Sequence, residues 1–274
     1  MRKNKANTIA IANQKGGVGK TTTAVNLAAS LIVSKRRVLL LDLDPQGNAT
    51  TGSGVDKYEL TSSINELLLG EAKIEDVLQT VSPAGFDILP ANRDLTAAAI
   101  GLLENDDKQG RLKNLLQPLL ENYDYVIIDC PPTLNMLTFN ALTAADGVLI
   151  PMQCEYFSLE GLSSLLDTIE QLQQTINPQL KIEGILRTMY DPRNRLTNDI
   201  NKQLHQHFAD KVYRTVIPRN VRLAEAPSFG KPVLHYEKNS QGAAAYLALA
   251  GEMIHRAVAQ QAAEIRTQSQ ESSW

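Results

Sequence analysis

The chain has 274 residues and a formal net charge of −3; 43% of its residues are hydrophobic and 21% are charged. That length suits one large α/β domain with an ample core, and the overall charge by itself indicates neither a nucleic-acid nor a membrane partner. The two cysteines, Cys130 and Cys154, are too few for a disulfide framework and favour a reducing cytoplasm, while no apolar run approaches the roughly 18 residues of a membrane span.

Short apolar runs alternate with longer helical patterns along the chain. Predicted strands lie at 8–12, 38–42, 86–89, 125–129, 148–151, 182–186 and 213–217. Predicted helices lie near 20–34, 62–69, 92–104, 109–121, 135–145, 158–175, 196–209 and 241–266. Several strands are apolar at consecutive positions, which is typical of strands buried on both faces. We therefore predict an α/β fold: a single doubly wound, mostly parallel sheet with helices on both faces.

The pattern predicts one domain. A short basic extension at 1–7 precedes a single domain at 8–266, and the polar segment 267–274 is predicted to be a disordered tail. No long linker rich in Pro, Gly or Ser and no internal repeat interrupts the domain.

A glycine-rich segment at 13–22 reads N-Q-K-G-G-V-G-K-T-T, between a predicted strand and a predicted helix. In that context backbone N–H groups and the positive end of the helix face a polyphosphate. The pattern G-x-x-x-x-G-K-[ST] fits at Gly19, Lys20 and Thr21, but its first glycine falls on Gln14. A second lysine, Lys15, precedes the glycines. The alternative, a basic residue solvated beside a glycine turn, leaves the rest of the string unexplained.

The string K-G-G-x-G-K-T-T resembles the deviant Walker A loop of the ParA/MinD branch of P-loop ATPases, whose extra lysine reaches across a nucleotide-sandwich dimer. The resemblance implies ATP and Mg²⁺ as cofactors and a homodimer when ATP is bound. It makes Lys15 the crossing lysine, and it places Lys20 on the β- and γ-phosphates. Nucleotide contacts are implied for Gly16, Gly17, Val18, Gly19, Lys20, Thr21 and Thr22, with Thr21 on Mg²⁺ and Thr22 on the α-phosphate.

Two predicted strands end in carboxylates, where P-loop enzymes place metal and water chemistry. The string D-L-D-P-Q-G-N begins at Asp42 and resembles the family's switch I. The resemblance implies that Asp44 positions or activates the attacking water and that Asp42, on the same face of the strand, is an outer-shell metal contact. The stretch around Asp129 resembles Walker B and switch II, so Asp129 is implied to hold the Mg²⁺ water shell. The alternative is a strand-end Asp that caps the following turn.

Catalysis is expected from positioning and charge neutralisation, with Lys15, Lys20 and Asp44 as the catalytic residues. Because none of them is a strong base, hydrolysis should be slow and stimulated by a partner. Met189 and Pro218 follow late strands at the edge where adenine should lie, although such residues also serve in packing and turns. By resemblance only, Glu155 contacts ribose or the partner's Lys15.

The segment 187–231 is basic in an acidic protein. It holds nine basic and four acidic residues, a local net charge of +5. Segregated positive charge predicts salt-sensitive binding to phosphate backbones without base reading, and the alternative is a solvated face with no ligand. The segment 212–232 resembles the chromosomal ParA proteins called Soj, which bind double-stranded DNA without sequence preference as ATP dimers. The resemblance makes Arg193, Arg219 and Arg222 the candidate DNA contacts.

The leading interpretation is a ParA/Soj-type ATPase that acts with a ParB-type partner on chromosome or plasmid DNA, in the cytoplasm at the nucleoid. The few residues before Asn7 cannot hold the helix-turn-helix domain of some plasmid relatives, so operator recognition by such a domain is not expected. The alternative function is a MinD-like regulator that positions a protein complex without DNA. It needs a lipid-docking C-terminus, whereas this one is rich in Ala, Gln, Ser and Glu, so no membrane partner is predicted.

Two further enzyme classes fit the loop but not the rest of the chain. A redox iron protein that resembles the nitrogenase reductase would bind its cluster through a cysteine at the position of Cys130. In that family glycines follow the cluster cysteine, and here they are missing. A small-molecule kinase would need an acceptor-binding lid, and no such segment is visible.

Overall fold

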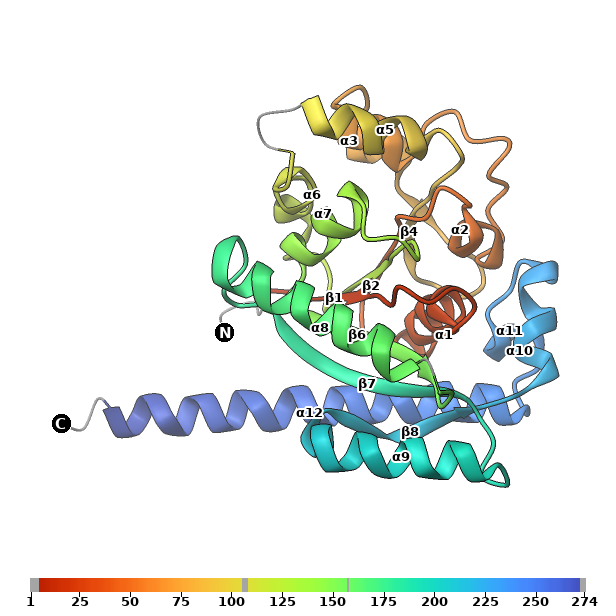
Figure 1. The fold of residues 1–274 in the computed structure, drawn as a ribbon. Coiled ribbons are helices and arrows are strands. Elements are labelled where there is room, and N and C mark those ends of the chain that lie inside the picture. The colour runs from red at the N-terminus through yellow and green to blue at the C-terminus, as the bar shows by residue number, and fades with distance from the viewer. Residues whose placement is uncertain (1–4, 105–107, 157, 272–274) are drawn as a thin grey trace.

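The computed structural model describes residues 5–104, 108–156 and 158–271, with side chains described up to residue 262. An eight-stranded sheet crosses the molecule in the order β3-β4-β2-β5-β1-β6-β7-β8 (Figure 1). Among the described strands β3 pairs with β4 antiparallel, and the other neighbouring pairs are parallel. The predicted α/β fold with a doubly wound, mostly parallel sheet is confirmed.

The strands match the apolar runs of the sequence to within a few residues. Their bounds are β1 (Asn7–Ile11), β2 (Val38–Asp42), β3 (Gln79–Thr80), β4 (Asp87–Leu89), β5 (Tyr125–Asp129), β6 (Gly147–Gln153), β7 (Lys181–Tyr190) and β8 (Val212–Pro218). Both β2 and β5 are buried at every position. The sequence did not predict β3, because its two exposed residues carry no hydrophobic period.

Helices cover both faces of the sheet (Figure 1). Their bounds are α1 (Lys20–Val33), α2 (Asn48–Gly52), α3 (Ile64–Leu69), α4 (Ile74–Val77), α5 (Leu95–Gly101), α6 (Arg111–Leu116), α7 (Met136–Ala144), α8 (Ser158–Thr175), α9 (Arg195–Phe208), α10 (Val221–Glu225), α11 (Val233–Tyr236) and α12 (Gln241–Glu271). Helices α2, α4, α10 and α11 were not predicted, because they are too short to show a helical period.

Two hydrophobic cores lie on opposite faces of the sheet. Along β2, Leu39 and Leu41 belong to one core and Val38 and Leu40 to the other, as the alternation of side chains on a strand requires. The first core is covered mainly by α3 and α5 to α9, and the second by α1, α11 and α12. This division explains why the central strands carry apolar residues at consecutive positions.

Helix α12 runs past the body of the molecule (Figure 1). Its backbone is helical to Glu271, whereas the sequence analysis places the end of the helix near 266 and a disordered tail from 267. The difference has a local reason: the segment is rich in the strong helix formers Ala, Gln and Glu, and no Pro or Gly follows Gly251. Residues 272–274 of the predicted tail lie outside the described part. Within the described ranges, no helix is both long and apolar enough to cross a membrane.

Gly184 on β7 gives a test of packing between β7 and β8. A Cβ there would lie 2.4 Å and 2.6 Å from ring atoms of the fully buried Tyr213. We expect Gly184→Ala to lower the free energy of unfolding by about 1–3 kcal/mol, because the ring has no room to move. Gly251→Ala, on α12 in open space, is the matched control and should stabilise by up to about 1 kcal/mol. Urea unfolding measures both; equal effects would contradict the packing.

Candidate functional site

The loop between β1 and α1 is shaped by glycines. Gly17 (φ 73°) and Gly19 (φ 89°) are in the left-handed region, which side chains other than glycine rarely adopt. Gly19 is the N-cap of α1 and supplies no side-chain cap. The first amides of α1 therefore lack intrahelical partners, and together with the positive end of the helix they form a site for an anion.

The carbonyl groups of this loop are held by side chains from three elements. The Lys20 ammonium donates to the Lys15 carbonyl at 3.2 Å. Gln153, at the end of β6, donates to the Gly17 carbonyl at 3.0 Å, and the Thr188 hydroxyl on β7 donates to the Val18 carbonyl at 2.8 Å. These bonds fix the loop against the carboxyl ends of β6 and β7. The sequence analysis missed Gln153 and Thr188; a polar residue near the end of each apolar run was the available signal.

The two lysines of the loop lie in different environments. Lys20 is buried, and burial lowers the pKa of its ammonium, while the Asp129 carboxylate opposes that shift. Lys15 is half-exposed, and its ammonium lies 2.7 Å from Glu155 of its own chain. Asn13 supports this arrangement: its side-chain oxygen accepts from the Lys15 amide, and its side-chain amide donates to the Pro151 carbonyl. The loop thus carries one buried cation and one cation held at the surface by a carboxylate.

Asp42 and Asp129 are register partners at the ends of the adjacent parallel strands β2 and β5, and both are fully buried. Asp42 is well bonded: one oxygen accepts from the Asp44 amide at 3.1 Å, and the other accepts from the amide and hydroxyl of Thr50, both at 2.8 Å. Burial raises its pKa to about 6. Asp42 therefore fastens the start of α2, as well as being a candidate outer contact of a metal.

Asp129 is the opposite case. Neither of its oxygens has a donor in good hydrogen-bond geometry. Burial, followed by the neighbouring Asp42 carboxylate, raises its pKa well above the ordinary value, and the nearby Thr21 hydroxyl and Lys20 ammonium oppose this shift only in part. A buried carboxylate without donors is costly unless a cation neutralises it. No cluster of three or more metal-ligating side chains occurs among the described residues. The Asp129 carboxylate fits Mg²⁺, which typically takes one or two protein carboxylates and completes its shell with water and phosphate oxygens.

The segment after β2 brings Asp44 towards the loop. One Asp44 oxygen accepts from the Gln46 amide at 3.0 Å, and the Gln46 carbonyl accepts from the Lys57 ammonium at 2.5 Å. The Asp44 carboxylate is near enough to oppose the lowering of the Lys20 pKa by burial and to add to the raised pKa of Asp129. The sequence analysis did not single out Lys57, because a lone lysine in an irregular segment carries no pattern.

A cavity of about 180 Å³ opens beside the N-terminus of α1. It is lined by Gly19, Thr22, Thr188, Met189, Ile217, Pro218, Arg219, Asn220, Leu223, Ala224 and Tyr246. Met189 and Pro218 were both predicted near the carboxyl ends of late strands. The structure brings them together in one apolar slot next to Thr22 of the loop. Met189 has φ 47°, a strained conformation for a residue with a side chain. A slot with apolar walls suits a flat aromatic base.

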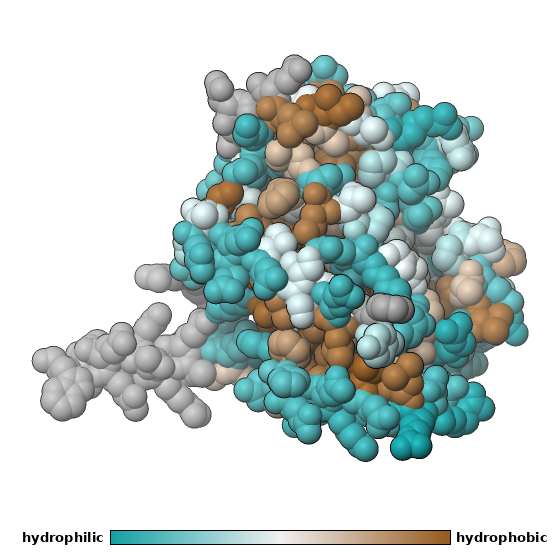
Figure 2. Space-filling model, viewed as in Figure 1, coloured by the Kyte–Doolittle hydropathy of each residue, from teal (hydrophilic) through white to brown (hydrophobic). Residues whose placement is uncertain are grey.

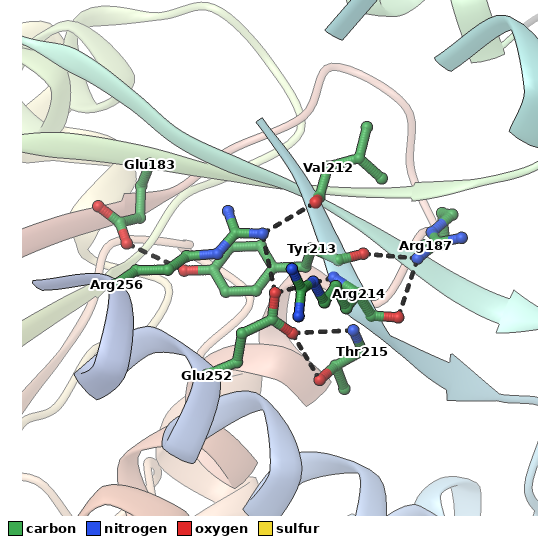
Figure 3. A network of polar contacts seen from close by, with 8 residues as sticks. All are labelled: Glu183, Arg187, Val212, Tyr213, Arg214, Thr215, Glu252 and Arg256. Carbon is green, nitrogen blue, oxygen red and sulfur yellow. Dashed lines mark hydrogen bonds and ion pairs between the residues drawn. The ribbon is translucent and has the colours of Figure 1, made fainter. Parts of the chain in front are cut away.

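A polar network fixes the strands that form this slot (Figure 3). Arg187 on β7 donates to the carbonyls of Tyr213 and Arg214 on β8 and to Asn201 on α9. Glu252 on α12 accepts from the amides of Arg214 and Thr215. Arg187 is only 5% exposed. The sequence analysis counted Arg187 among the positive charges of the basic segment. The structure corrects this, because the Arg187 guanidinium is buried and holds β7 to β8 by hydrogen bonds.

Among the candidate DNA contacts, Arg219 lines the slot, and Arg193 and Arg222 lie within a few residues of its lining along the chain. Arg193 follows β7, and Arg219 and Arg222 follow β8; all three are exposed. Figure 2 shows hydrophilic side chains over α9, next to these segments. Arg193 is paired with Asp191, and Arg222 with Glu225. The structure therefore leaves the three predicted arginines exposed, and it gives two of them carboxylate partners that the sequence analysis did not anticipate.

Comparisons with known proteins agree with this geometry. A protein-family model described as an AAA domain matches residues 6–182. The chain is 50% identical over 248 residues to the chromosome partitioning protein ParA of Myxococcus xanthus (90% of this chain, 88% of that protein). It is 51% identical over 245 residues to the sporulation initiation inhibitor protein Soj of Bacillus subtilis (89% and 97%). Among solved structures, cobyrinic acid a,c-diamide synthase from Mycobacterium smegmatis with bound ADP and magnesium is 39% identical, with a TM-score of 0.79 and coverage of 90% and 93%.

The contrast between the two buried carboxylates gives a stability test. Asp129→Asn should raise the free energy of unfolding at pH 7 by on the order of 1–3 kcal/mol in the absence of ligands, because it removes a fully buried carboxyl group whose ionised form is disfavoured by burial and by Asp42. Asp42→Asn should not share this gain, since its NH₂ group would face the Asp44 amide donor.

The sign of the pH dependence follows from the raised pKa of Asp129. The penalty is absent where the carboxyl is protonated in both states, and it grows as the pH rises above the unfolded pKa of about 4. The gain from Asp129→Asn should therefore shrink as the pH falls towards 4. Chemical denaturation across this range measures it, and equal gains for the two variants would show that Asp129 is not the unpaired partner.

Proposed function

This chain belongs to the ParA/Soj family of chromosome-partitioning ATPases, and from that premise we propose that ATP switches it between a single chain and a DNA-binding dimer. A ParB-type partner stimulates hydrolysis and so releases the dimer from DNA. The family membership supports ATP hydrolysis as the activity. The observation that carries the finer proposal is the position of the base slot, whose walls continue directly into the segments with the exposed arginines.

The nucleotide lies along the loop with its base in the slot. The amides of the segment 16–22 and the Lys20 ammonium hold the phosphates, Thr22 contacts the α-phosphate, and Met189 and Pro218 enclose adenine. Thr21 and Asp129 hold Mg²⁺, and Asp42 supports them from behind. When bound, Mg²⁺ would neutralise the negative charge of the phosphate groups. The two unpartnered oxygens of Asp129 support this assignment.

Asp44 orients the attacking water from the segment that follows β2. Its own hydrogen bond is local, to the Gln46 amide, so the carboxylate can turn towards a γ-phosphate without breaking contacts in the core. A carboxylate that only orients water is a weak base, which accounts for slow hydrolysis until a partner acts.

Lys15 serves the second nucleotide of the dimer. In the single chain its ammonium is paired with Glu155, at side-chain exposures of 36% and 51%. Exposed ion pairs of this kind contribute at most about 1 kcal/mol, so the lysine exchanges its partner at little cost. Across the dimer it neutralises the other subunit's phosphates, and Glu155 is left to contact ribose or the partner subunit's Lys15.

The dimer binds double-stranded DNA through the basic segment, at the nucleoid in the cytoplasm. Arg193, Arg219 and Arg222 contact phosphates, so binding reads no base sequence and weakens steeply with salt. Two copies of the segment in one dimer double the number of phosphate contacts. Doubling these contacts makes DNA binding conditional on ATP.

The DNA proposal predicts an ATP-dependent, salt-sensitive affinity. Binding to a random-sequence duplex should appear with ATP, be weak with ADP or without nucleotide, and fall linearly in log–log plots against salt. Arg222→Glu should leave ATP hydrolysis intact and lose DNA retention. Fluorescence anisotropy with a colorimetric phosphate assay measures both. Wild-type affinity in Arg222→Glu would refute the basic segment as the DNA surface.

The dimer proposal predicts opposite phenotypes for two loop residues. Asp44→Ala should bind ATP without hydrolysing it and accumulate as a dimer, because Lys15 still crosses. Adding Lys15→Ala to that variant should return it to a single chain while ATP binding persists, since Lys20 is unchanged. Light scattering at saturating ATP gives the mass. A single-chain mass for Asp44→Ala would contradict the sandwich.

A further inference from the structure

Arg193 is clamped by the carboxylate two residues before it. The Nε and Nη2 atoms of Arg193 donate to the two oxygens of Asp191 at 2.9 Å and 2.8 Å, and the Arg193 amide also donates to Asp191 at 3.1 Å. Hydrogen bonds from Arg193 lower the pKa of Asp191 to about 2, so this carboxyl is ionised at neutral pH. Even so, 88% of the Arg193 side chain is exposed. The guanidinium of Arg193 therefore faces solvent, but its Nε–Nη2 edge already donates two hydrogen bonds to Asp191.

Arg222 is held in a similar way on the other segment. Its Nη1 atom donates to Glu225 at 2.7 Å, and the same Glu225 oxygen accepts from the Tyr236 hydroxyl at 3.1 Å. Tyr236 in turn stacks on Phe229, which fixes the acceptor in place. Hydrogen bonding to Arg222 lowers the pKa of Glu225. Two of the three candidate DNA contacts are therefore neutralised by a neighbouring carboxylate in the free protein.

These pairs occupy the groups that a phosphate needs. A phosphate binds arginine best through two parallel hydrogen bonds from one edge of the guanidinium, and Asp191 takes such an edge, Nε with Nη2. Exposed pairs are weak, so DNA can displace them. The carboxylates nevertheless cancel part of the positive field that attracts DNA, and they must be displaced at every binding event.

We propose that Asp191 and Glu225 are built-in competitors of the DNA phosphates, which hold Arg193 and Arg222 in ion pairs and so lower the affinity of the protein for DNA. This inference rests on the proposed DNA binding and adds two acidic residues to its surface. Both acids tune the affinity of the arginines and touch no nucleotide.

The placement of the pairs connects them to the nucleotide. Asp191 lies two residues after Met189, and Glu225 follows Ala224; Met189 and Ala224 both line the base slot. Arg219, another residue of that lining, also acts on the Asp191 charge. A base in the slot therefore contacts the two segments that carry the ion pairs. Asp191 and Glu225 therefore lie between the residues that line the slot and the arginines proposed to bind DNA.

The decisive experiment compares Asp191→Asn with Asp199→Asn by anisotropy on a random-sequence duplex with ATP, across a salt series. Both changes add the same charge to the basic segment, but Asp199 lies 4.0 Å from Lys202 and holds no arginine fork. Asp191→Asn should tighten binding several-fold, up to roughly tenfold near 0.1 M salt, because Arg193 no longer has to leave a carboxylate before it contacts a phosphate. Asp199→Asn should leave the affinity near the wild-type value.

Two further variants test whether the effect arises from the ion pairs themselves. Arg193→Ala combined with Asp191→Asn should abolish the increase in DNA affinity, because the guanidinium that Asp191 pairs with is no longer present. Glu225→Gln should tighten binding like Asp191→Asn, and thermal unfolding checks that each variant is folded. Equal affinities for Asp191→Asn and Asp199→Asn, with ATP-dependent binding intact in the wild type, would overturn this inference alone. Absence of ATP-dependent binding in the wild type would overturn the proposed function and this inference with it.

Discussion

The parallel alignment of β2, β5, β1, β6 and β7 positions the candidate site. Because parallel strands point the same way, their carboxyl ends meet at one edge of the sheet. Asp42 and Asp129 become register partners there, the glycine-rich loop leaves β1 beside them, and Gln153 and Thr188 reach the loop from the other side. Residues from five distant parts of the chain thus share one edge without any long irregular segment to bring them together.

Several features at that edge of the sheet lower the stability of the ligand-free protein. Asp129 is buried without a donor, Lys20 is buried with its pKa lowered, and Met189 holds a strained backbone. Each feature is unfavourable in the ligand-free protein and becomes favourable when a cation, a phosphate or a base is present. A ligand that binds only the folded protein stabilises it, so nucleotide and metal are expected to contribute to stability as well as to activity.

Much of the fold and of the loop could be predicted from the sequence, because each rests on a local pattern. Consecutive apolar residues marked strands buried on both faces, and the glycines with two lysines marked the phosphate loop. The short helices α2 and α10 have no hydrophobic period, so only tertiary packing defines them. The charge count also failed in detail: Arg187 is buried between strands, and Arg193 and Arg222 are paired. A sum of charges contains no information on which carboxylate faces which arginine.

A second contact joins the region after β2 to the segment that carries Arg222. Asp42 fastens α2 through Thr50, and just after α2 the chain meets the turn that follows α10: a Cβ on Gly54 would lie 2.7 Å from the Gly230 carbonyl, and one on Gly230 would lie 2.8 Å from the Gly54 Cα. Both glycines have positive φ. Backbones that approach this closely leave no room for side chains at either glycine, so the segment after α2 and the segment after α10 are packed tightly together. The slot, lined by Leu223 and Ala224, and this glycine contact therefore hold the α10 segment at two separate places.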